Sequence, residues 1–360
     1  MKKILIFANT YYQMIFAAQL KKTILKDDYV EIILSDRSNG MEEIVKKIKQ
    51  TGVFENCQYI KIKNCDQHIS FGRKILDCID ISLRGNNRYN IYLKGINSKY
   101  FDEFLFFNSD IEIEGIYSIL LKYNKNIAIS LFEEGMLNYP LDIIPTQREK
   151  AISVLKMMLH KPCLCNQKFH FYCFYPQLYY GKGIAIKVPL IARNSSVSSF
   201  LSKIFEPDLN IYKQRYIFFT SVYDFEGDNP VGEYGLVCEI AELVGKDNIL
   251  VKTHPRDTRT IYTENGFNVD KNSSIPWEVI QLIGDFSDKI FLTINSGSVL
   301  SGSTMSEKPV RTYYMYKLCD ISGNEACKKN AQDIELLLQN DSTKEILRNV
   351  KIADNLEDIL

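Results

Sequence analysis

The chain has 360 residues, of which 46% are apolar and 24% are charged. These fractions are close to those of ordinary folded proteins, so they exclude a long disordered chain and a collagen-like repeat. At about 100–200 residues per domain, the length indicates two domains or one large one. The 44 basic and 44 acidic side chains cancel. No protein-wide positive field is therefore present to attract nucleic acid, and any anion must be bound locally.

The amino-terminal segment Lys3–Ala8 is apolar, as in a signal peptide, but it ends at Asn9 and Thr10 without a cleavage site of small residues. We interpret it as a buried strand. No stretch elsewhere reaches the roughly 18 uninterrupted apolar residues that a membrane span requires. The nine cysteines are scattered, which favours reduced, mostly buried thiols over a disulfide framework. We therefore expect a cytoplasmic protein.

The first half of the chain alternates apolar strands with segments of helical periodicity. We expect strands at Lys3–Ala8, Tyr29–Asp36, Gln58–Ile62, Glu103–Asn108 and Asn126–Phe132, and helices at Tyr12–Leu25, Met41–Thr51 and Ile111–Tyr123. Alternation of this kind predicts a parallel sheet with helices on both faces.

A polar, small-residue stretch at Asn194–Ser199 marks the expected domain boundary. We divide the chain into a first domain (1–195), a second domain (196–345) and a carboxy-terminal tail (346–360). The second domain repeats the alternation, with strands at Tyr216–Thr220, Ile249–Thr253, Lys289–Ile294 and Val310–Tyr314, and helices at Gly235–Val244, Pro276–Leu282 and from about Gly297–Val299. The predicted fold class is α/β, with two doubly wound Rossmann-like domains facing a central cleft. Such sheets bind ligands at the carboxyl ends of their strands.

The first polar motif at a strand end is Glu133-Glu134-Gly135. Adjacent carboxylates point to opposite sides of an extended chain, so at most one faces a given site, and Gly135 permits a sharp turn. A carboxylate placed there could take a proton from a substrate hydroxyl. The alternative is a pair of solvated acids in a turn.

The second motif follows the strand Ile249–Thr253, where His254 precedes Pro255. The proline restricts the backbone of His254 to an extended conformation, which fixes the direction of its side chain. Lys252 and Arg256 flank it with the positive charge that a phosphate or carboxylate requires. The alternative is a structural histidine.

The third motif, Asn295-Ser296-Gly297-Ser298, lies between a predicted strand and a helix that also contains Ser301 and Ser303. Hydroxyls and free backbone N–H groups at a helix amino terminus suit one phosphate group. An ordinary serine helix cap is the alternative, but it uses a single hydroxyl.

A further cluster contains His160, Cys163, Cys165, His170 and Cys173. Thiolates and imidazoles can hold zinc, but this spacing lacks the paired Cys-x-x-Cys turn that gives such sites their specificity. We therefore expect no metal site, and we interpret these residues as part of an apolar, aromatic segment.

Taken together and in this order, the three motifs resemble the bacterial sialyltransferases, most closely glycosyltransferase family 52, the lipooligosaccharide and capsular polysaccharide sialyltransferases. The segment Asn9–Met14 after the first strand is similar to the opening of that family. The resemblance spans residues 1 to about 315. It implies a GT-B fold, CMP-sialic acid as donor, a surface glycan as acceptor, inversion at the anomeric carbon, and no metal or other cofactor.

The resemblance also implies roles for single residues. His254 would assist the departing phosphate, Ser296 and Ser298 would hold it, and Glu278 would hold the ribose hydroxyls. A protonated histidine, hydroxyls and a helix amino terminus are together able to neutralise a nucleoside monophosphate without a metal. The expected donor-binding set is Lys252, Pro255, Arg256, Glu278, Asn295, Ser296, Gly297 and Ser298, in which Lys252 and Arg256 are assigned by charge to the carboxylate of the sialic acid.

Three acids compete for the role of catalytic base. Glu133 is the first choice and Glu134 is its neighbour. Asp224, after the first strand of the second domain, is the alternative because family members also use an acid there.

Two other functions remain open: a GT-B transferase with a different nucleotide-sugar donor, and a non-catalytic protein that binds a nucleotide or sugar. A diphosphate donor would require more cationic side chains than the motif around His254 supplies. We expect an acceptor that ends in galactose or sialic acid. The segments Arg148–Leu159 and His170–Tyr180 are candidates for contact with a lipid-linked acceptor at the inner face of the membrane, or for a core position or a homodimer surface.

Overall fold

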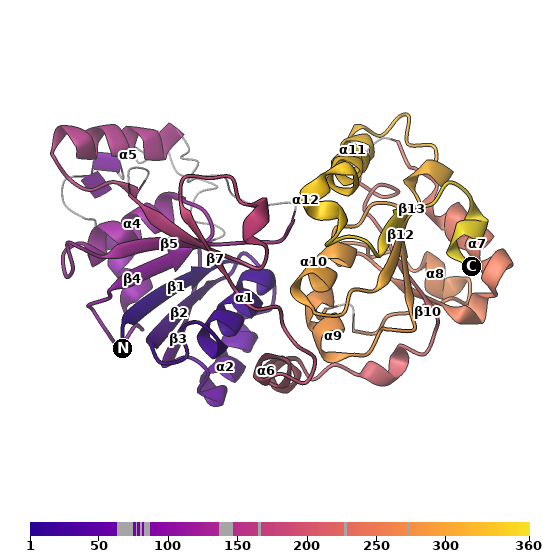
Figure 1. Cartoon of the computed structure of the whole chain (residues 1–360), viewed down its shortest axis with the longest axis horizontal. Helices are drawn as coiled ribbons and strands as arrows, with labels where there is room; N and C mark the ends of the chain where they lie inside the picture. The colour runs from indigo at the N-terminus through magenta and orange to yellow at the C-terminus, as the bar shows by residue number, and fades with distance from the viewer. Residues whose placement is uncertain are drawn as a thin grey trace. The chain divides into compact units, whose positions relative to one another are not determined.

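The computed structural model describes residues 1–62, 75–76, 78–79, 81–82, 87–136, 147–164, 167–226, 229–272 and 274–360. The chain divides into two compact units, Met1–Pro189 and Leu190–Leu360. Each unit is built around its own parallel sheet (Figure 1).

The first unit contains a seven-stranded sheet in the order β3-β2-β1-β4-β5-β6-β7, in which every neighbouring pair is parallel. Figure 1 shows α1 and α2 on one face of this sheet and α4 and α5 on the other. The elements are β1 (Lys3–Ala8), α1 (Tyr11–Lys22), β2 (Tyr29–Ser35), α2 (Met41–Thr51), β3 (Asn56–Ile60), β4 (Glu103–Phe106), α4 (Ile111–Leu120), β5 (Ala128–Phe132), α5 (Gln147–Met158), β6 (Phe169–Cys173) and β7 (Ile184–Lys187).

The order of the strands reverses between β1 and β4, so the carboxyl ends of these two strands form the topological switch point of the first sheet. Helices begin directly after both ends. The side chain of Thr10 caps α1 by accepting from the N–H of Gln13, and Asp110 caps α4 by accepting from Ile113. Capping by a short polar side chain is the expected way to start a helix after a buried strand.

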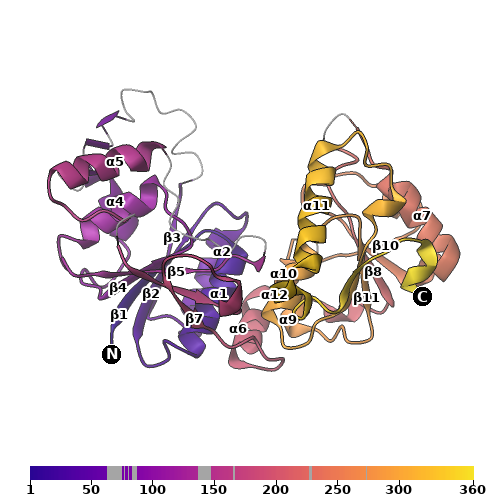
Figure 2. The ribbon, with the colours of Figure 1, turned by 45° about the horizontal axis from the view of Figure 1, so that its top comes forward.

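The second unit contains a six-stranded parallel sheet in the order β10-β9-β8-β11-β12-β13, with its switch point between β8 and β11. Figure 2 shows α7 on one face of this sheet and α9, α10 and α11 on the other. The elements are α6 (Ser196–Phe205), β8 (Tyr216–Phe219), α7 (Glu233–Val244), β9 (Ile249–Lys252), α8 (Ile261–Glu264), β10 (Asn268–Val269), α9 (Trp277–Ile283), β11 (Ile290–Thr293), α10 (Ser298–Met305), β12 (Arg311–Tyr314), α11 (Glu325–Gln339), α12 (Asp341–Lys344) and β13 (Val350–Ile352).

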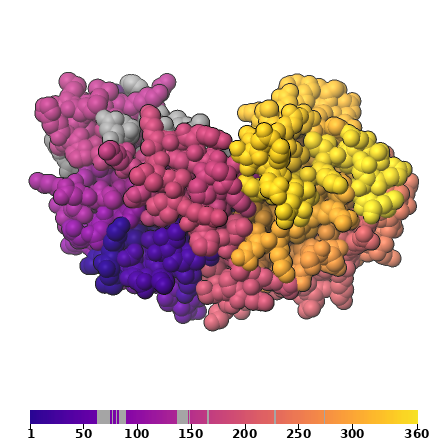
Figure 3. Space-filling view, in the orientation of Figure 1, coloured from indigo at the N-terminus to yellow at the C-terminus, as the bar shows by residue number. Residues whose placement is uncertain are grey.

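The predicted α/β class with two doubly wound Rossmann-like domains is confirmed, but two local interpretations change. The polar stretch at Asn194–Ser199 opens α6, because the hydroxyl of Ser195 accepts from the N–H of Ser198 as a helix cap. Residues 346–360, expected as a tail, contribute β13, which pairs with β12. Figure 3 shows the end of the chain, in yellow, packed into the surface of the second unit.

The aromatic segment at His170–Tyr180 is mostly core. Phe171, Tyr172 and Cys173 are buried in β6, which lies between β5 and β7, and the ring of Phe171 stacks on Tyr179 with centroids 4.5 Å apart. This segment therefore offers little surface to a partner, although the side chain of Tyr180 is exposed. In the part of the chain that the structure describes, no helix is long and apolar enough to cross a membrane.

Candidate active site

The two adjacent carboxylates at the end of β5 have different surroundings. Glu133 is 1% exposed; its Oε1 accepts from the hydroxyl of Tyr12 at 2.6 Å and its Oε2 from the N–H of Phe174 at 2.9 Å. These bonds tie the end of β5 to α1 and to the residue after β6. A carboxylate that is buried and accepts from two fixed donors is held as part of the structure.

Glu134 lies at the surface of the same edge and is half-buried. Its Oε1 accepts from the hydroxyl of Thr10 at 2.7 Å. Burial raises the pKa of the Glu134 carboxyl, while hydrogen bonds from Thr10 and Gln13 lower it again. A raised pKa improves a carboxylate as an acceptor of protons. Gly135 then turns the chain with a φ of 86°, a conformation that glycine adopts without strain.

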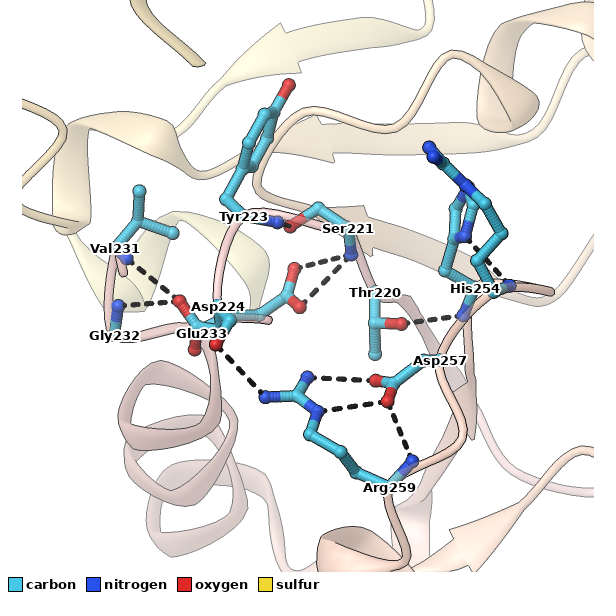
Figure 4. Close-up of polar contacts among 11 residues, drawn as sticks. Thr220, Ser221, Tyr223, Asp224, Val231, Gly232, Glu233, His254, Asp257 and Arg259 are labelled. Atoms are coloured by element: carbon cyan, nitrogen blue, oxygen red, sulfur yellow. Dashed lines mark hydrogen bonds and ion pairs between the residues drawn. The ribbon is translucent and has the colours of Figure 1, made fainter. Parts of the chain in front are cut away.

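In the second unit, His254 follows β9 and is fixed by two backbone contacts (Figure 4). Its N–H donates to Oγ1 of Thr220, the residue after β8, at 2.8 Å, and its Nδ1 accepts from the N–H of Arg256 at 3.2 Å. A ring nitrogen that accepts carries no proton, so the neutral ring carries its proton on Nε2. Burial lowers the pKa of His254, and the charge of Arg256 lowers it further. The structure thus favours a neutral histidine with an Nε2–H donor, where the sequence led us to expect a protonated one.

The loop after β8 contains Asp224, the alternative base. Its Oδ1 accepts from the N–H groups of Val231 at 2.8 Å and Gly232 at 3.0 Å, just before α7 (Figure 4). One oxygen of this carboxylate is therefore occupied in closing the loop.

Glu233, the first residue of α7, was not predicted as a site residue. It is fully buried, and both of its carboxyl oxygens lie within 3.0 Å of the N–H of Ser221 (Figure 4). Burial raises the pKa of Glu233 to about 8, although the Ser221 bonds lower it. Because Thr220 and Ser221 are consecutive, Glu233 fixes the strand end that in turn holds His254. An acid at the start of a helix is too common in sequences to have identified it.

Arg259 joins the loops after β8 and β9 (Figure 4). Its Nε and Nη2 donate to the two oxygens of Asp257 at 2.9 and 2.8 Å, and its guanidinium lies 4.6 Å from the ring centroid of Phe225. A bidentate pair stacked on an aromatic ring is a rigid arrangement that lysine cannot reproduce. The sequence shows this arginine two residues after Asp257, but only the fold brings it to Phe225.

The two cations expected to bind the sialic acid carboxylate are already paired. Nζ of Lys252 is buried, lies 3.1 Å from Oδ2 of Asp270 and sits over the ring of Trp277. The charge of Lys252 is thus balanced inside the second unit, and its donor-binding role stays a prediction. Arg256 is exposed and pairs with Glu226 at 2.7 Å. An exposed pair of this kind is weak, so Arg256 keeps the capacity to bind an anion.

The serine motif lies at the end of β11 and the start of α10. The hydroxyls of Ser296 and Ser298 are 2.7 Å apart and both residues are half-buried, while Gly297 is exposed. Asn295 is different: it is buried and its Nδ2 donates to the carbonyl of Cys327 at 2.9 Å. Asn295 thus anchors α11, and its role in direct donor binding stays a prediction.

Glu278 is the second residue of α9, which packs beside α10. Burial raises the pKa of Glu278, and a hydrogen bond with Ser301 of α10 lowers it. The carboxyl of Glu278 and the serine motif therefore lie near the amino termini of two helices, α9 and α10, that pack side by side.

The cysteine and histidine cluster does not form a described metal centre. Cys163 and Cys173 are buried and form no disulfide with another described cysteine, whereas Cys165 lies outside the described residues. Among the residues that the structure describes, no three His, Cys, Asp or Glu side chains are grouped as metal ligands.

No family model and no curated protein matches the sequence. Among solved structures, the chain is similar to an alpha/beta-galactoside alpha-2,3-sialyltransferase from Photobacterium phosphoreum, with 11% identity, a TM-score of 0.52 and full coverage of both chains. It is also similar to Arabidopsis thaliana UGT89C1 complexed with UDP (10% identity, TM-score 0.48, 99% of this chain and 86% of that chain) and to Acinetobacter baumannii MurG (10%, 0.43, 100% and 89%).

The chain has the fold of GT-B glycosyltransferases. At these identities the likeness establishes the fold alone, and the chemistry must be argued from the residues at the strand ends.

Proposed function

We propose that this protein is an inverting, metal-independent sialyltransferase that transfers sialic acid from CMP-sialic acid to a hydroxyl of a lipooligosaccharide or capsular polysaccharide. The observation that carries the proposal is the placement of the three motifs. Glu133-Glu134-Gly135, His254-Pro255 and Asn295–Ser298 follow the carboxyl ends of β5, β9 and β11, in the order of the family they resemble. These are the edges at which open parallel sheets bind ligands.

On the donor side, the second unit supplies groups suited to a nucleoside monophosphate. The paired hydroxyls of Ser296 and Ser298 stand at the start of α10 and would bind phosphate oxygens. Nε2–H of His254 would donate to the same phosphate as its bond to the sugar breaks. The carboxyl of Glu278 would accept from the ribose hydroxyls.

For the acceptor we assign the base to Glu134 rather than Glu133. Glu134 is half-buried and bonded by the side chains of Thr10 and Gln13 at the surface of the sheet edge, whereas Glu133 is buried and accepts from Tyr12 and Phe174 inside the unit. The acceptor hydroxyl would transfer its proton to Glu134 while its oxygen bonds to the anomeric carbon. The bond from that carbon to the phosphate breaks with its electron pair, and CMP leaves. Asp224 stays the alternative base.

Contact with a membrane is a separate part of the proposal. On α5, Val154, Met157 and Met158 expose more than half of their side-chain surface, and Leu159 follows them. These residues would lie against a lipid surface that carries the acceptor, or against a second copy of the chain.

The direct test is release of CMP from CMP-sialic acid by the purified protein in EDTA, with and without galactose-terminated and sialylated acceptors. We expect release that an acceptor stimulates. Assays with CDP- and UDP-sugars in parallel test the alternative of a GT-B transferase that uses a different nucleotide-sugar donor. No release with any acceptor, together with no thermal stabilisation by CMP, would show that the donor assignment is wrong. Thermal stabilisation by CMP without turnover would instead indicate a non-catalytic protein that binds a nucleotide.

A further inference from the structure

Four neighbouring strands of the first sheet, β2-β1-β4-β5, are joined at their carboxyl ends by side chains that each cross one strand. Glu134, after β5, reaches Thr10, after β1, and so crosses the end of β4. Arg37, after β2, approaches Asp110, after β4, with Nη2 3.9 Å from Oδ2, and so crosses the end of β1. All four residues therefore lie around the switch point of this sheet.

The loop that carries Arg37 is held by contacts on both sides of that residue. The hydroxyl of Ser35 donates to Oδ1 of Asn9 at 2.6 Å, and the hydroxyl of Tyr11 donates to the carbonyl of Asn39 at 2.6 Å. Arg37 thus extends from a loop fixed to the start of α1, which limits the entropy lost when it binds a ligand.

Arg37 and Asp110 keep hydrogen-bonding capacity. Their separation of 3.9 Å is too long for a hydrogen bond, and their side chains are 46% and 25% exposed. Among the described residues, no side-chain hydrogen bond of Arg37 occurs. The carboxyl of Asp110 accepts at Oδ1 from the N–H of Ile113 and also has a side-chain hydrogen bond with Glu112, which together fix its direction. A carboxylate has about four lone-pair sites, so it can still accept from a ligand hydroxyl.

The surroundings of the pair favour a neutral ligand. The carboxyl of Asp110 balances the charge of Arg37, and Glu112, Glu149 and Glu134 add acidic groups at the same edge. An anionic ligand would meet these acids, whereas a donor next to an acceptor suits two adjacent hydroxyls of a sugar.

We propose that Arg37 and Asp110 bind two adjacent hydroxyls of a neutral acceptor sugar, beside Glu134. This inference rests on the proposed function, because it places the acceptor at the first unit. It selects a galactose-type terminus over a sialic acid terminus, a choice that the sequence left open.

The experiment measures binding of methyl β-galactoside and of 3′-sialyllactose by saturation-transfer NMR without nucleotide. It uses the wild-type chain, R37M, D110N and the matched control R348M, which removes an exposed arginine paired with Glu345. We expect R37M and D110N to weaken galactoside binding by about tenfold or more, since each loses a charge-assisted hydrogen bond. R348M should bind as the wild type does. Of the two deoxy galactosides, the one that lacks the hydroxyl bound by Arg37 should bind the wild type and R37M alike, whereas the other should still bind R37M more weakly.

In turnover assays, R37M should raise KM for the acceptor about tenfold, with KM for CMP-sialic acid within twofold of the wild type. Unchanged galactoside affinity in R37M and D110N, no galactoside binding by the wild type, or tighter binding of sialyllactose would each overturn the inference. If R37M abolishes galactoside binding but the protein releases no CMP, the sugar site is retained and the proposed donor is rejected. If the protein releases CMP but R37M leaves the acceptor KM unchanged, the proposed donor is retained and the sugar site is rejected.

Discussion

The hydroxyl of Tyr12 donates to Oε1 of Glu133 at 2.6 Å, across 121 residues of sequence. This contact, with the bond from Phe174, occupies the carboxylate that the sequence favoured as base. Its neighbour Glu134 faces the other way and meets the hydroxyl of Thr10. Two consecutive acids therefore have different roles, one in stability and one in the proposed chemistry.

Glu134→Gln should lower turnover by about 100-fold or more, because an amide cannot take the acceptor proton. The free energy of unfolding should change little, since the amide oxygen still accepts from Thr10. Steady-state kinetics and urea denaturation measure the two effects. The matched variant Glu133→Gln should instead destabilise the chain by about 1–3 kcal/mol, because the buried donors lose a charged acceptor. Loss of turnover in E133Q with E134Q active would reverse the assignment.

His254→Ala should reduce turnover by about 100-fold or more and leave donor affinity within roughly tenfold, because the imidazole acts on the leaving phosphate. The pH dependence of turnover tests whether the neutral or the protonated form of His254 is active. Burial and Arg256 lower the pKa of His254, so the neutral ring predominates at pH 7 and above. Turnover should therefore hold as the pH rises from 6.5 to 8, provided that donor and acceptor are saturating. If turnover of the wild type falls across that interval and turnover of H254A does not, the active form is the protonated histidine.

Glu233 should make stability depend on pH. Burial raises the pKa of Glu233 to about 8 in the folded state, whereas the unfolded chain releases this proton near pH 4.3. Between these values the folded state binds the extra proton, so stability falls as the pH rises and levels off above about 8. Each pKa unit corresponds to about 1.4 kcal/mol.

The corresponding measurement is urea denaturation of the wild type and Glu233→Gln from pH 5 to 9. The glutamine variant has no carboxyl to titrate, so its stability relative to the wild type should increase with pH. A difference between the two proteins that stays constant over this range would contradict a raised pKa.

Ser296→Ala and Ser298→Ala should each weaken CMP binding by about tenfold to 100-fold, as expected for the loss of one hydrogen bond to a charged group, about 1.5–3 kcal/mol. Their hydroxyls lie 2.7 Å apart, so the double variant should lose less than the sum of the two single losses. Isothermal titration with CMP measures these affinities. Ser322→Ala, which alters an exposed serine away from strand ends, is the control. Full CMP affinity in the double variant would exclude the serine motif from the phosphate site.

The strands at the centre of each sheet could be predicted because they are continuous apolar runs. Lys3–Ala8 is observed with the predicted bounds, and β8, β9 and β11 differ from prediction by one or two residues at their ends. The missed strands β10 and β13 have two and three residues, too few to show a periodicity. β7 was missed because, at the sheet edge, its four residues are all exposed or half-buried and show no apolar run.

The positions of the polar motifs in the fold could be predicted from the sequence, but the partners of their side chains could not. The three motifs lie at strand ends as expected, yet Lys252 is committed to Asp270 and Asn295 to the carbonyl of Cys327. Neither partner is next to its motif in the sequence. Arg37 and Asp110 were not singled out, because an arginine and an acid 73 residues apart carry no local signal.

The sequence by itself determined the fold class and the edge of each sheet at which the polar motifs lie. Hydrophobic periodicity and the residues that end a strand are local properties of the chain. Only the tertiary structure decided which polar groups at those edges already have partners. That decision depends on strand order, which brings Tyr12 to Glu133, Thr10 to Glu134 and Arg37 to Asp110. A buried polar group must be paired, so the groups left accessible at the edge are those available to a substrate.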